Sequence, residues 1–123
     1  MIIGIGIDLV DIERFRRSLT RTPTMRQRLF TPIELAYVAD KVDPVPSLAA
    51  RFAAREAVMK SLGLGLGAFG FHDVWVERAE SGAPSLAITG RAQELAQGAG
   101  IGTWHLSLTH SDSVAGAYVV AAR

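Results

Sequence analysis

Two carboxylates and a lysine are the residues of this chain whose types and positions suggest chemistry. Asp8 directly follows Ile2–Ile7, a short apolar run that we predict to be a buried strand. Glu56 and Lys60 lie four residues apart, about one helical turn, in an alanine-rich segment that we predict to be a helix. Two carboxylates, completed by phosphate and water oxygens, make a ligand set that suits Mg²⁺. Taken together, the three residues indicate a magnesium and phosphate site.

Each of these residues also has a simpler structural explanation. Asp8 could cap a helix that begins after it, a position where aspartate is favoured. Glu56 could form an ion pair with Lys60, because the glutamate-first spacing of four residues favours one. Taken one residue at a time, the sequence favours these simpler explanations.

The segment that follows Lys60 offers groups that can hold a phosphate. It combines the lysine with the Ser61 hydroxyl and with backbone amides around Gly63. The glycine order is not that of a P-loop, and Gly63 is equally explained as the stop signal of the helix. His110 and Ser111, in the turn between the last two predicted strands, could add polar contacts.

Composition excludes several classes of protein. The chain has 123 residues and no cysteine, which rules out disulfides and thiolate metal sites. A net charge of +1 argues against a nucleic-acid binder, and no apolar run is long enough to span a membrane. The first residues do not resemble a signal peptide, so we expect a cytoplasmic protein. A hydrophobic content of 49% against 20% charged residues is high, and it suggests a subunit interface.

Arginines are concentrated in the first quarter of the chain. Six lie between positions 14 and 28, namely Arg14, Arg16, Arg17, Arg21, Arg26 and Arg28. Such a run is either a solvated helix face or a docking surface for an acidic partner. Composition alone favours the solvated face.

The hydrophobic pattern predicts one α+β domain that covers residues 1–123. We expect a helix over 9–20, a short helix over 25–30, and a helix that begins at Thr31 and Pro32 with Glu34 completing a capping box. A long helix over 48–62 is expected to begin with Ser47 as its cap and to end at Gly63. The predicted strands are 2–7, 71–78, 84–89, 103–109 and 114–123, with a loop over 63–70 and a helix over 91–97.

Three motifs resemble one known family. They are Gly4-Ile-Gly-Ile-Asp-Leu-Val-Asp-Ile-Glu13, Arg51-Phe-Ala-Ala-Arg-Glu-Ala-Val-Met-Lys60 and Ser107-Leu-Thr-His-Ser111. In order, spacing and total length they are similar to holo-acyl-carrier-protein synthase, the small class of 4′-phosphopantetheinyl transferases. One departure is Arg55, where the family usually has lysine.

The resemblance implies both a fold and an activity. The fold would be the 4′-phosphopantetheinyl transferase-like one, a small antiparallel sheet packed with helices. The enzyme would transfer 4′-phosphopantetheine from coenzyme A to a serine of apo acyl carrier protein, releasing 3′,5′-ADP, in fatty acid biosynthesis. Family members are similar to one another in forming homotrimers whose active sites are shared between two subunits.

The resemblance also implies roles for individual residues. Asp8 and Glu56 would be the Mg²⁺ ligands, and Lys60 would bind phosphate and assist the leaving group. Arg14, Arg17 and Arg21 would dock the acyl carrier protein. The residues implied to contact coenzyme A are Arg51, Lys60, Ser61, Gly63, Gly82, Pro84, His110 and Ser111.

Two other functions remain compatible with the same residues. A different Mg²⁺-dependent nucleotide or phosphate transferase would use the carboxylate pair without needing the arginine-rich helix. A non-catalytic trimeric binding module would use Asp8 and Glu56 in structural ion pairs and would show no metal dependence.

Overall fold

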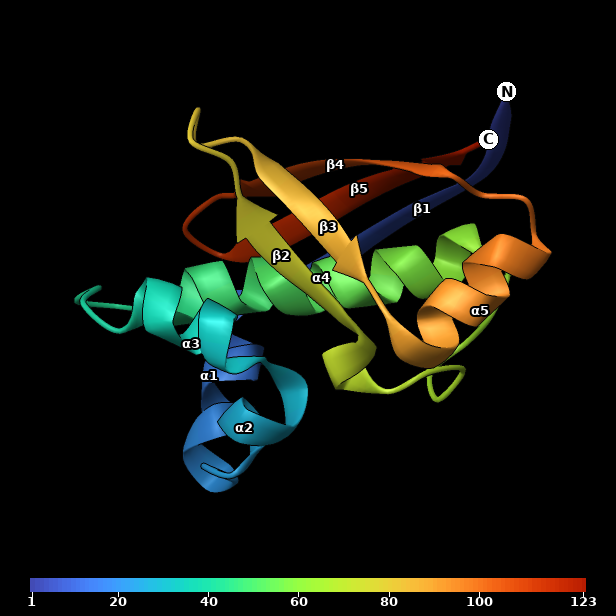
Figure 1. The fold of residues 1–123 in the computed structure, drawn as a ribbon. Coiled ribbons are helices and arrows are strands. Elements are labelled where there is room, and N and C mark those ends of the chain that lie inside the picture. The colour runs from blue at the N-terminus through green and yellow to red at the C-terminus, as the bar shows by residue number, and fades with distance from the viewer.

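One long central helix is surrounded by two antiparallel sheets and four shorter helices (Figure 1). The structure is a computed structural model and describes residues 1–123. The strands are β1 (Ile2–Asp11), β2 (Val74–Arg78), β3 (Pro84–Ile88), β4 (Thr103–His110) and β5 (Val114–Ala122). The α-helices are α1 (Ile12–Arg21), α2 (Met25–Leu29), α3 (Pro32–Val38), α4 (Val45–Ser61) and α5 (Gly90–Gly98), and a short 3₁₀ turn covers Phe71–Asp73.

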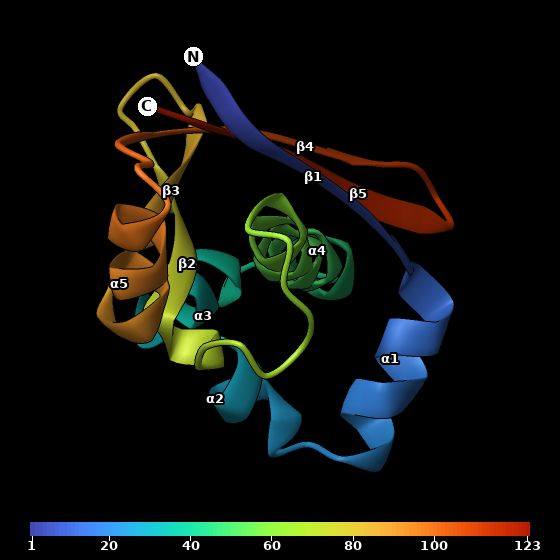
Figure 2. The same ribbon diagram turned by 90° about the vertical axis from the view of Figure 1, so that its right-hand side faces the viewer.

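The central helix is α4, and the other elements pack around it. Figure 2 shows α4 end-on, with the three-stranded sheet β1-β5-β4 along one side of it. The β2–β3 hairpin and α5 lie on a second side, and α1 and α2 lie on the others (Figure 2). Helices combined with small antiparallel sheets confirm the predicted α+β class. No helix has both the length and the hydropathy needed to cross a bilayer.

Glycines bring β1 into backbone contact with α4. Gly4 and Gly6 face the helix, and a Cβ on either would overlap a helix carbonyl oxygen, that of Ser61 or Ala57 respectively. Only glycine permits this approach, because any larger residue would push the strand away from the helix. Side chains alternate along a strand, so Asp8 points to the same face as the two glycines.

The opposite face of β1 is apolar and exposed. Ile5, Ile7 and Leu9 project away from α4, and each is more than half exposed. Tyr118, on the neighbouring strand β5, is also exposed and pairs with Ile7 in the antiparallel register. A sheet face with this many exposed apolar side chains is typical of a surface that another molecule covers.

The first strand is longer than the sequence predicted. β1 continues to Asp11 instead of ending at Ile7, and α1 begins at Ile12. Leu9 and Val10, which we predicted to be helical, pair with β5 instead. The apolar spacing fits a helix, but pairing with β5 supplies backbone hydrogen bonds over the whole segment and decides its conformation.

This boundary changes the explanation of Asp8. The residue that caps α1 is Asp11, whose Oδ1 accepts a hydrogen bond from the backbone N–H of Arg14 at 2.9 Å. The hypothesis that Asp8 is a helix cap is therefore wrong.

The long helix α4 begins earlier than predicted. Its first residue is Val45, and Ser47 lies inside the first turn instead of capping it. The predicted start lay beyond Pro46, but proline is tolerated in the first turn, where its missing N–H would have no helical partner. The helix ends as predicted, with Gly63 just beyond it at a φ of 72°.

The other predicted elements are confirmed, with small differences at their ends. Thr31 and Glu34 form the expected capping box at the start of α3. The predicted hairpin is present as β2 and β3, although residues 71–73 form a 3₁₀ turn instead of the start of the strand.

A fully buried ion pair ties α3 and α4 to β2. The guanidinium of Arg55 donates to both carboxylate oxygens of Glu34, and both side chains are completely buried. Arg55 also donates to the carbonyl of Phe71, while Glu34 accepts from the backbone N–H of Val76. Arg55, where the motif resemblance led us to expect lysine, therefore has a structural role in the core.

We expect Arg55→Met to reduce the free energy of unfolding by about 3–5 kcal/mol, because it leaves the carboxylate of Glu34 buried without its counter-ion. Urea denaturation measures this change. Arg91→Met is the matched control, because Arg91 pairs with Glu94 on the surface. The control should cost no more than about 1 kcal/mol. Equal effects of the two substitutions would contradict the structural role of the buried pair.

Candidate active site

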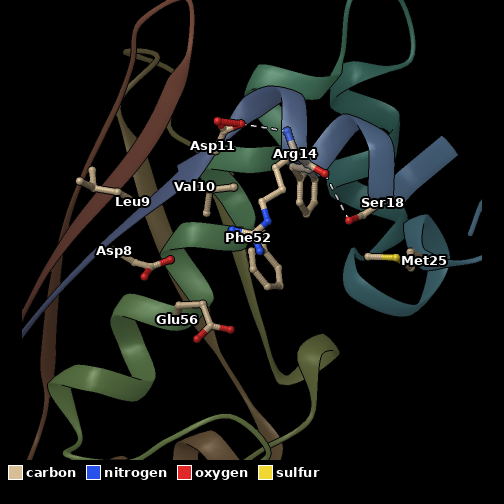
Figure 3. A pocket seen from close by; sticks show the side chains of 10 residues that line it. Asp8, Leu9, Val10, Asp11, Arg14, Ser18, Met25, Phe52 and Glu56 are labelled. Carbon is tan, nitrogen blue, oxygen red and sulfur yellow. Dashed lines mark hydrogen bonds between the residues drawn. The ribbon is translucent and has the colours of Figure 1, made fainter. Parts of the chain in front are cut away.

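A pocket of about 560 Å³ opens where β1, α1 and α4 meet (Figure 3). Its polar side is formed by Asp8 and Glu56, which come from two different elements. Arg14 reaches into it from α1 (Figure 3). Its lining is completed by Leu9, Val10, Asp11, Phe15, Ser18, Met25 and Phe52. The pocket therefore combines three acidic side chains with one arginine and an apolar surface.

Asp8 and Glu56 lie side by side because β1 and α4 are in contact (Figure 3). Asp8 is 18% exposed and accepts a hydrogen bond on Oδ1 from the ammonium of Lys60 at 3.1 Å. The same ammonium donates to the carbonyl oxygen of Ile7 at 3.0 Å. The structure thus brings together the two carboxylates and the lysine that the sequence singled out.

Glu56 has no counter-ion of its own. It forms no hydrogen bond or ion pair with Lys60, so the predicted alternative of a Glu56–Lys60 pair is wrong. Burial raises the pKa of Glu56, and the negative charge of Asp8 raises it further, while Lys60 opposes both effects. The site therefore concentrates negative charge beyond what the single ammonium offsets.

The carboxylate pair fits a magnesium ion. Carboxylate oxygens are the hard ligands that Mg²⁺ prefers, and it is commonly held by one or two of them together with water and substrate phosphates. No three acidic, histidine or cysteine side chains lie close enough together to hold a metal ion by themselves. A cation held here would therefore take its other ligands from outside the chain.

The arginines of α1 divide into two groups. Arg16 is held by Glu13 and by both carboxylate oxygens of Asp43, which join α1 to the segment before α4. Arg14, Arg17 and Arg21 are exposed, and their side chains form no ion pair. At spacings of three and four residues they form one basic stripe along the helix. The stripe begins at the pocket.

Arg51 lies outside this pocket, on another side of α4. It lines a smaller pocket of about 240 Å³ with Tyr37 and Arg78, which the sequence analysis did not single out. Its guanidinium lies over the Tyr37 ring at 4.5 Å, and its buried Nε has no hydrogen-bond partner. Burial lowers the pKa of Arg51, and the positive charge of Arg78 lowers it further. The pocket therefore holds two arginines that form no ion pair with a carboxylate.

The remaining predicted contacts to coenzyme A are dispersed over the chain. The Ser61 hydroxyl is buried and donates to the carbonyl of Val58, and Gly63 follows at the same end of α4. Gly82 is in the β2–β3 turn and Pro84 is the first residue of β3, while His110 is the last residue of β4 and Ser111 is in the β4–β5 turn. Figure 2 shows these two turns on opposite sides of α4. One chain alone does not bring the whole set together.

Sequence reasoning missed the apolar wall of the main pocket. Phe15 and Phe52 stack at 5.4 Å between ring centroids, and Met25 completes the wall from α2. The signal for Phe52 was its position one turn before Glu56. Nothing local distinguished Met25, because α2 reaches the pocket only through the tertiary fold.

Comparisons with known proteins identify the family of this chain. The sequence model described as the 4′-phosphopantetheinyl transferase superfamily matches residues 4–122. The chain belongs to this superfamily. The resemblance on which the sequence analysis relied is thereby confirmed.

Relatives within the family match over nearly the whole length. A holo-[acyl-carrier-protein] synthase of Beutenbergia cavernae is 47% identical, with all of both chains covered. The crystal structure of holo-[acyl-carrier-protein] synthase from Neisseria meningitidis superposes with a TM-score of 0.90 at 32% identity, covering 100% of each chain. The Helicobacter pylori synthase, solved in complex with coenzyme A, gives a TM-score of 0.83 at 29% identity, covering 96% of this chain and 99% of that one.

Proposed function

We propose that this protein is a holo-acyl-carrier-protein synthase, which transfers 4′-phosphopantetheine from coenzyme A to a serine of apo acyl carrier protein in fatty acid biosynthesis. The observation that carries the proposal is the convergence of Asp8 and Glu56 in a pocket that the basic stripe of α1 borders. The named activity of the family relatives, and the coenzyme A bound to one of them, support the same reaction.

The reaction forms one bond and breaks another at phosphorus. The serine oxygen of the carrier bonds to the β-phosphorus of coenzyme A, the bond to 3′,5′-ADP breaks, and the serine proton passes to a pocket carboxylate or to water. Bound Mg²⁺ supplies a positive charge that offsets the charge developing on the pyrophosphate. Asp8 and Glu56 hold that ion, and Lys60 stabilises the leaving phosphate.

We place the nucleotide end of coenzyme A on the dispersed residues. Arg51, which lines a pocket together with Arg78, faces the phosphates, and Gly82 with Pro84 adds contacts beside it. His110 and Ser111, together with Gly63 and Ser61, complete the contacts. Because these groups lie on different sides of α4 within a single chain, a second subunit supplies some of the contacts to coenzyme A.

A homotrimer would provide this arrangement. The exposed apolar face formed by Ile5, Ile7, Leu9 and Tyr118 supports the trimer, because burying it removes apolar surface from water. Each active site would then lie between two subunits, as the family resemblance implies.

The basic stripe of Arg14, Arg17 and Arg21 docks the carrier protein. We expect Arg14→Glu to raise the KM for the carrier by about tenfold or more, with a smaller change in kcat, because charge at a docking surface acts chiefly on association. Steady-state assays at two salt concentrations measure the effect, which should shrink as salt rises.

Arg91→Glu is the control for the stripe. It makes the same change of charge on α5, away from the pocket, and should leave the KM for the carrier unchanged. Similar KM values for Arg14→Glu and Arg91→Glu would rule out docking of the carrier at α1.

The proposed activity is tested by the release of 3′,5′-ADP. Coenzyme A and apo acyl carrier protein are incubated with the protein and Mg²⁺, and the nucleotide is quantified by chromatography. We expect one 3′,5′-ADP for each carrier molecule, and none from a carrier whose serine is replaced by alanine. Release that does not depend on the carrier serine would refute the transferase and leave a hydrolase.

A further inference from the structure

The ammonium of Lys60 occupies one side of the carboxylate pair in the free protein. It lies 3.1 Å from Oδ1 of Asp8, and its second contact, with the carbonyl of Ile7, fixes it against β1. Asp8 is 18% exposed while Lys60 is 52% exposed, so the carboxylate is the sheltered partner and the lysine the accessible one. The side chain of Glu56, by contrast, forms no hydrogen bond or ion pair.

We propose that Lys60 acts as a placeholder that competes with the divalent cation for Asp8, so that metal binding and coenzyme A binding are coupled. The inference rests on the proposed function, because it takes Asp8 as a metal ligand and the pyrophosphate as the substrate group. In the free protein a cation must displace the ammonium or share Asp8 with it.

The competition follows from charge. An ammonium and a divalent cation repel each other at contact distance, and both bind the same carboxylate. Of the two paired carboxylates, only Glu56 is free to receive the cation without a rearrangement. The ammonium therefore weakens the site for a metal that arrives without substrate.

The arrival of phosphate reverses the competition. The lysine is half exposed on a flexible stem at the last turn of α4, so its ammonium can turn from Asp8 to a phosphate oxygen. Asp8 is then released to the metal at the moment when phosphate oxygens complete its shell. By linkage, the metal must strengthen coenzyme A binding by the same factor.

The test is a calorimetric titration of the full chain with Mg²⁺ alone, in the absence of coenzyme A. Lys60→Met should bind Mg²⁺ roughly five- to fifty-fold more tightly than the wild type, a change that lies within the ordinary range of coupling between sites. The matched control is Lys41→Met, which removes the chain's other lysine at a position outside the carboxylate pocket. It should leave the Mg²⁺ affinity unchanged.

A second titration, with coenzyme A at saturation, tests the coupling. Coenzyme A should strengthen Mg²⁺ binding more in the wild type than in Lys60→Met, because only the wild type has a competitor to remove. A Lys60→Met variant that binds Mg²⁺ no more tightly than the wild type, or that binds none, overturns the proposal. So does an equal gain in Lys41→Met, which would indicate a general effect of net charge.

The placeholder role of Lys60 and the proposed transferase activity can be refuted separately. Wild-type transfer of phosphopantetheine without a gain of Mg²⁺ affinity in Lys60→Met refutes the placeholder alone. If Lys60→Met gains Mg²⁺ affinity but the wild type transfers no phosphopantetheine, the competition between Lys60 and the metal is supported and the proposed function is refuted.

Discussion

Glu56→Gln should abolish most transfer activity while leaving the fold intact. Loss of a charged group that stabilises the transition state commonly costs about a hundred- to a thousandfold in kcat. Glutamine keeps the shape and the helix propensity of glutamate, and Glu56 makes no hydrogen bond or ion pair that the substitution would break. The rate of carrier modification at saturating substrates measures the loss.

The same variant should be at least as stable as the wild type at neutral pH. Burial and the charge of Asp8 raise the pKa of Glu56 above its ordinary value of 4.5. A carboxyl with a raised pKa binds its proton more tightly in the folded state, so its contribution to stability is complete below the ordinary pKa. That contribution is lost as pH rises through the raised value. In metal-free buffer, the stability of Glu56→Gln relative to the wild type, measured by thermal unfolding, should therefore increase as pH rises.

Glu94→Gln provides the control for both measurements. Glu94 is an exposed residue of α5 that pairs only with Arg91. Its replacement should change neither the transfer rate nor the dependence of stability on pH. Normal turnover by Glu56→Gln would show that Glu56 is not a metal ligand, and loss of activity through unfolding would leave its role in the reaction unsupported.

Gly6→Ala should destabilise the protein and disrupt the site together. A Cβ at this position would overlap the backbone carbonyl of Ala57 in α4, and backbone yields less readily than the end of a side chain. We expect a loss of about 3 kcal/mol or more in the free energy of unfolding, at the upper end for overpacked cores. Because β1 also carries Asp8, its displacement should separate the two carboxylates and lower the activity of the folded fraction.

Gly98→Ala is the matched control for this substitution. Nothing lies within 4 Å of a Cβ built at Gly98, and this glycine ends α5 with an ordinary backbone conformation. Urea denaturation should show a change of no more than about 1 kcal/mol, towards greater stability. A Gly6→Ala variant as stable as Gly98→Ala would contradict the close contact of β1 with α4.

The carboxylate site could be predicted from the sequence because its residues follow simple spacings. Glu56 and Lys60 are one helical turn apart, and Asp8 belongs to a recognisable motif with Gly4 and Gly6. The sequence analysis combined Asp8 and Glu56 into one Mg²⁺ ligand set, and the motif resemblance implied the same roles. The partner of Lys60 was missed, because the bond to Asp8 crosses from α4 to β1, and no local pattern encodes it.

The end of β1 could not be predicted for a different reason. Its apolar residues Ile5, Ile7 and Leu9 face outward, while glycines and an aspartate face the helix. This is the reverse of the usual strand, whose apolar face meets the core. Sequence reasoning therefore read Leu9 as part of an amphipathic helix. An outward apolar face is typical of a surface that another molecule covers.

The burial of Arg55 also lay beyond the sequence. An arginine next to Glu56 in a helix is ordinarily a surface residue, since arginine is rarely buried without a partner. Its partner, Glu34, lies 21 positions away and was recognised only as half of a capping box. One glutamate serves both purposes, a combination that the fold alone reveals.

The central claim is tested most directly by intact-protein mass spectrometry of an apo acyl carrier protein incubated with this protein, coenzyme A and Mg²⁺. We predict that the carrier gains the mass of one phosphopantetheine group. The gain should disappear when the metal is chelated and should be strongly reduced with Glu56→Gln. No gain with several apo carriers, from a protein that also fails to bind coenzyme A, would contradict the account and leave Asp8 and Glu56 as structural residues.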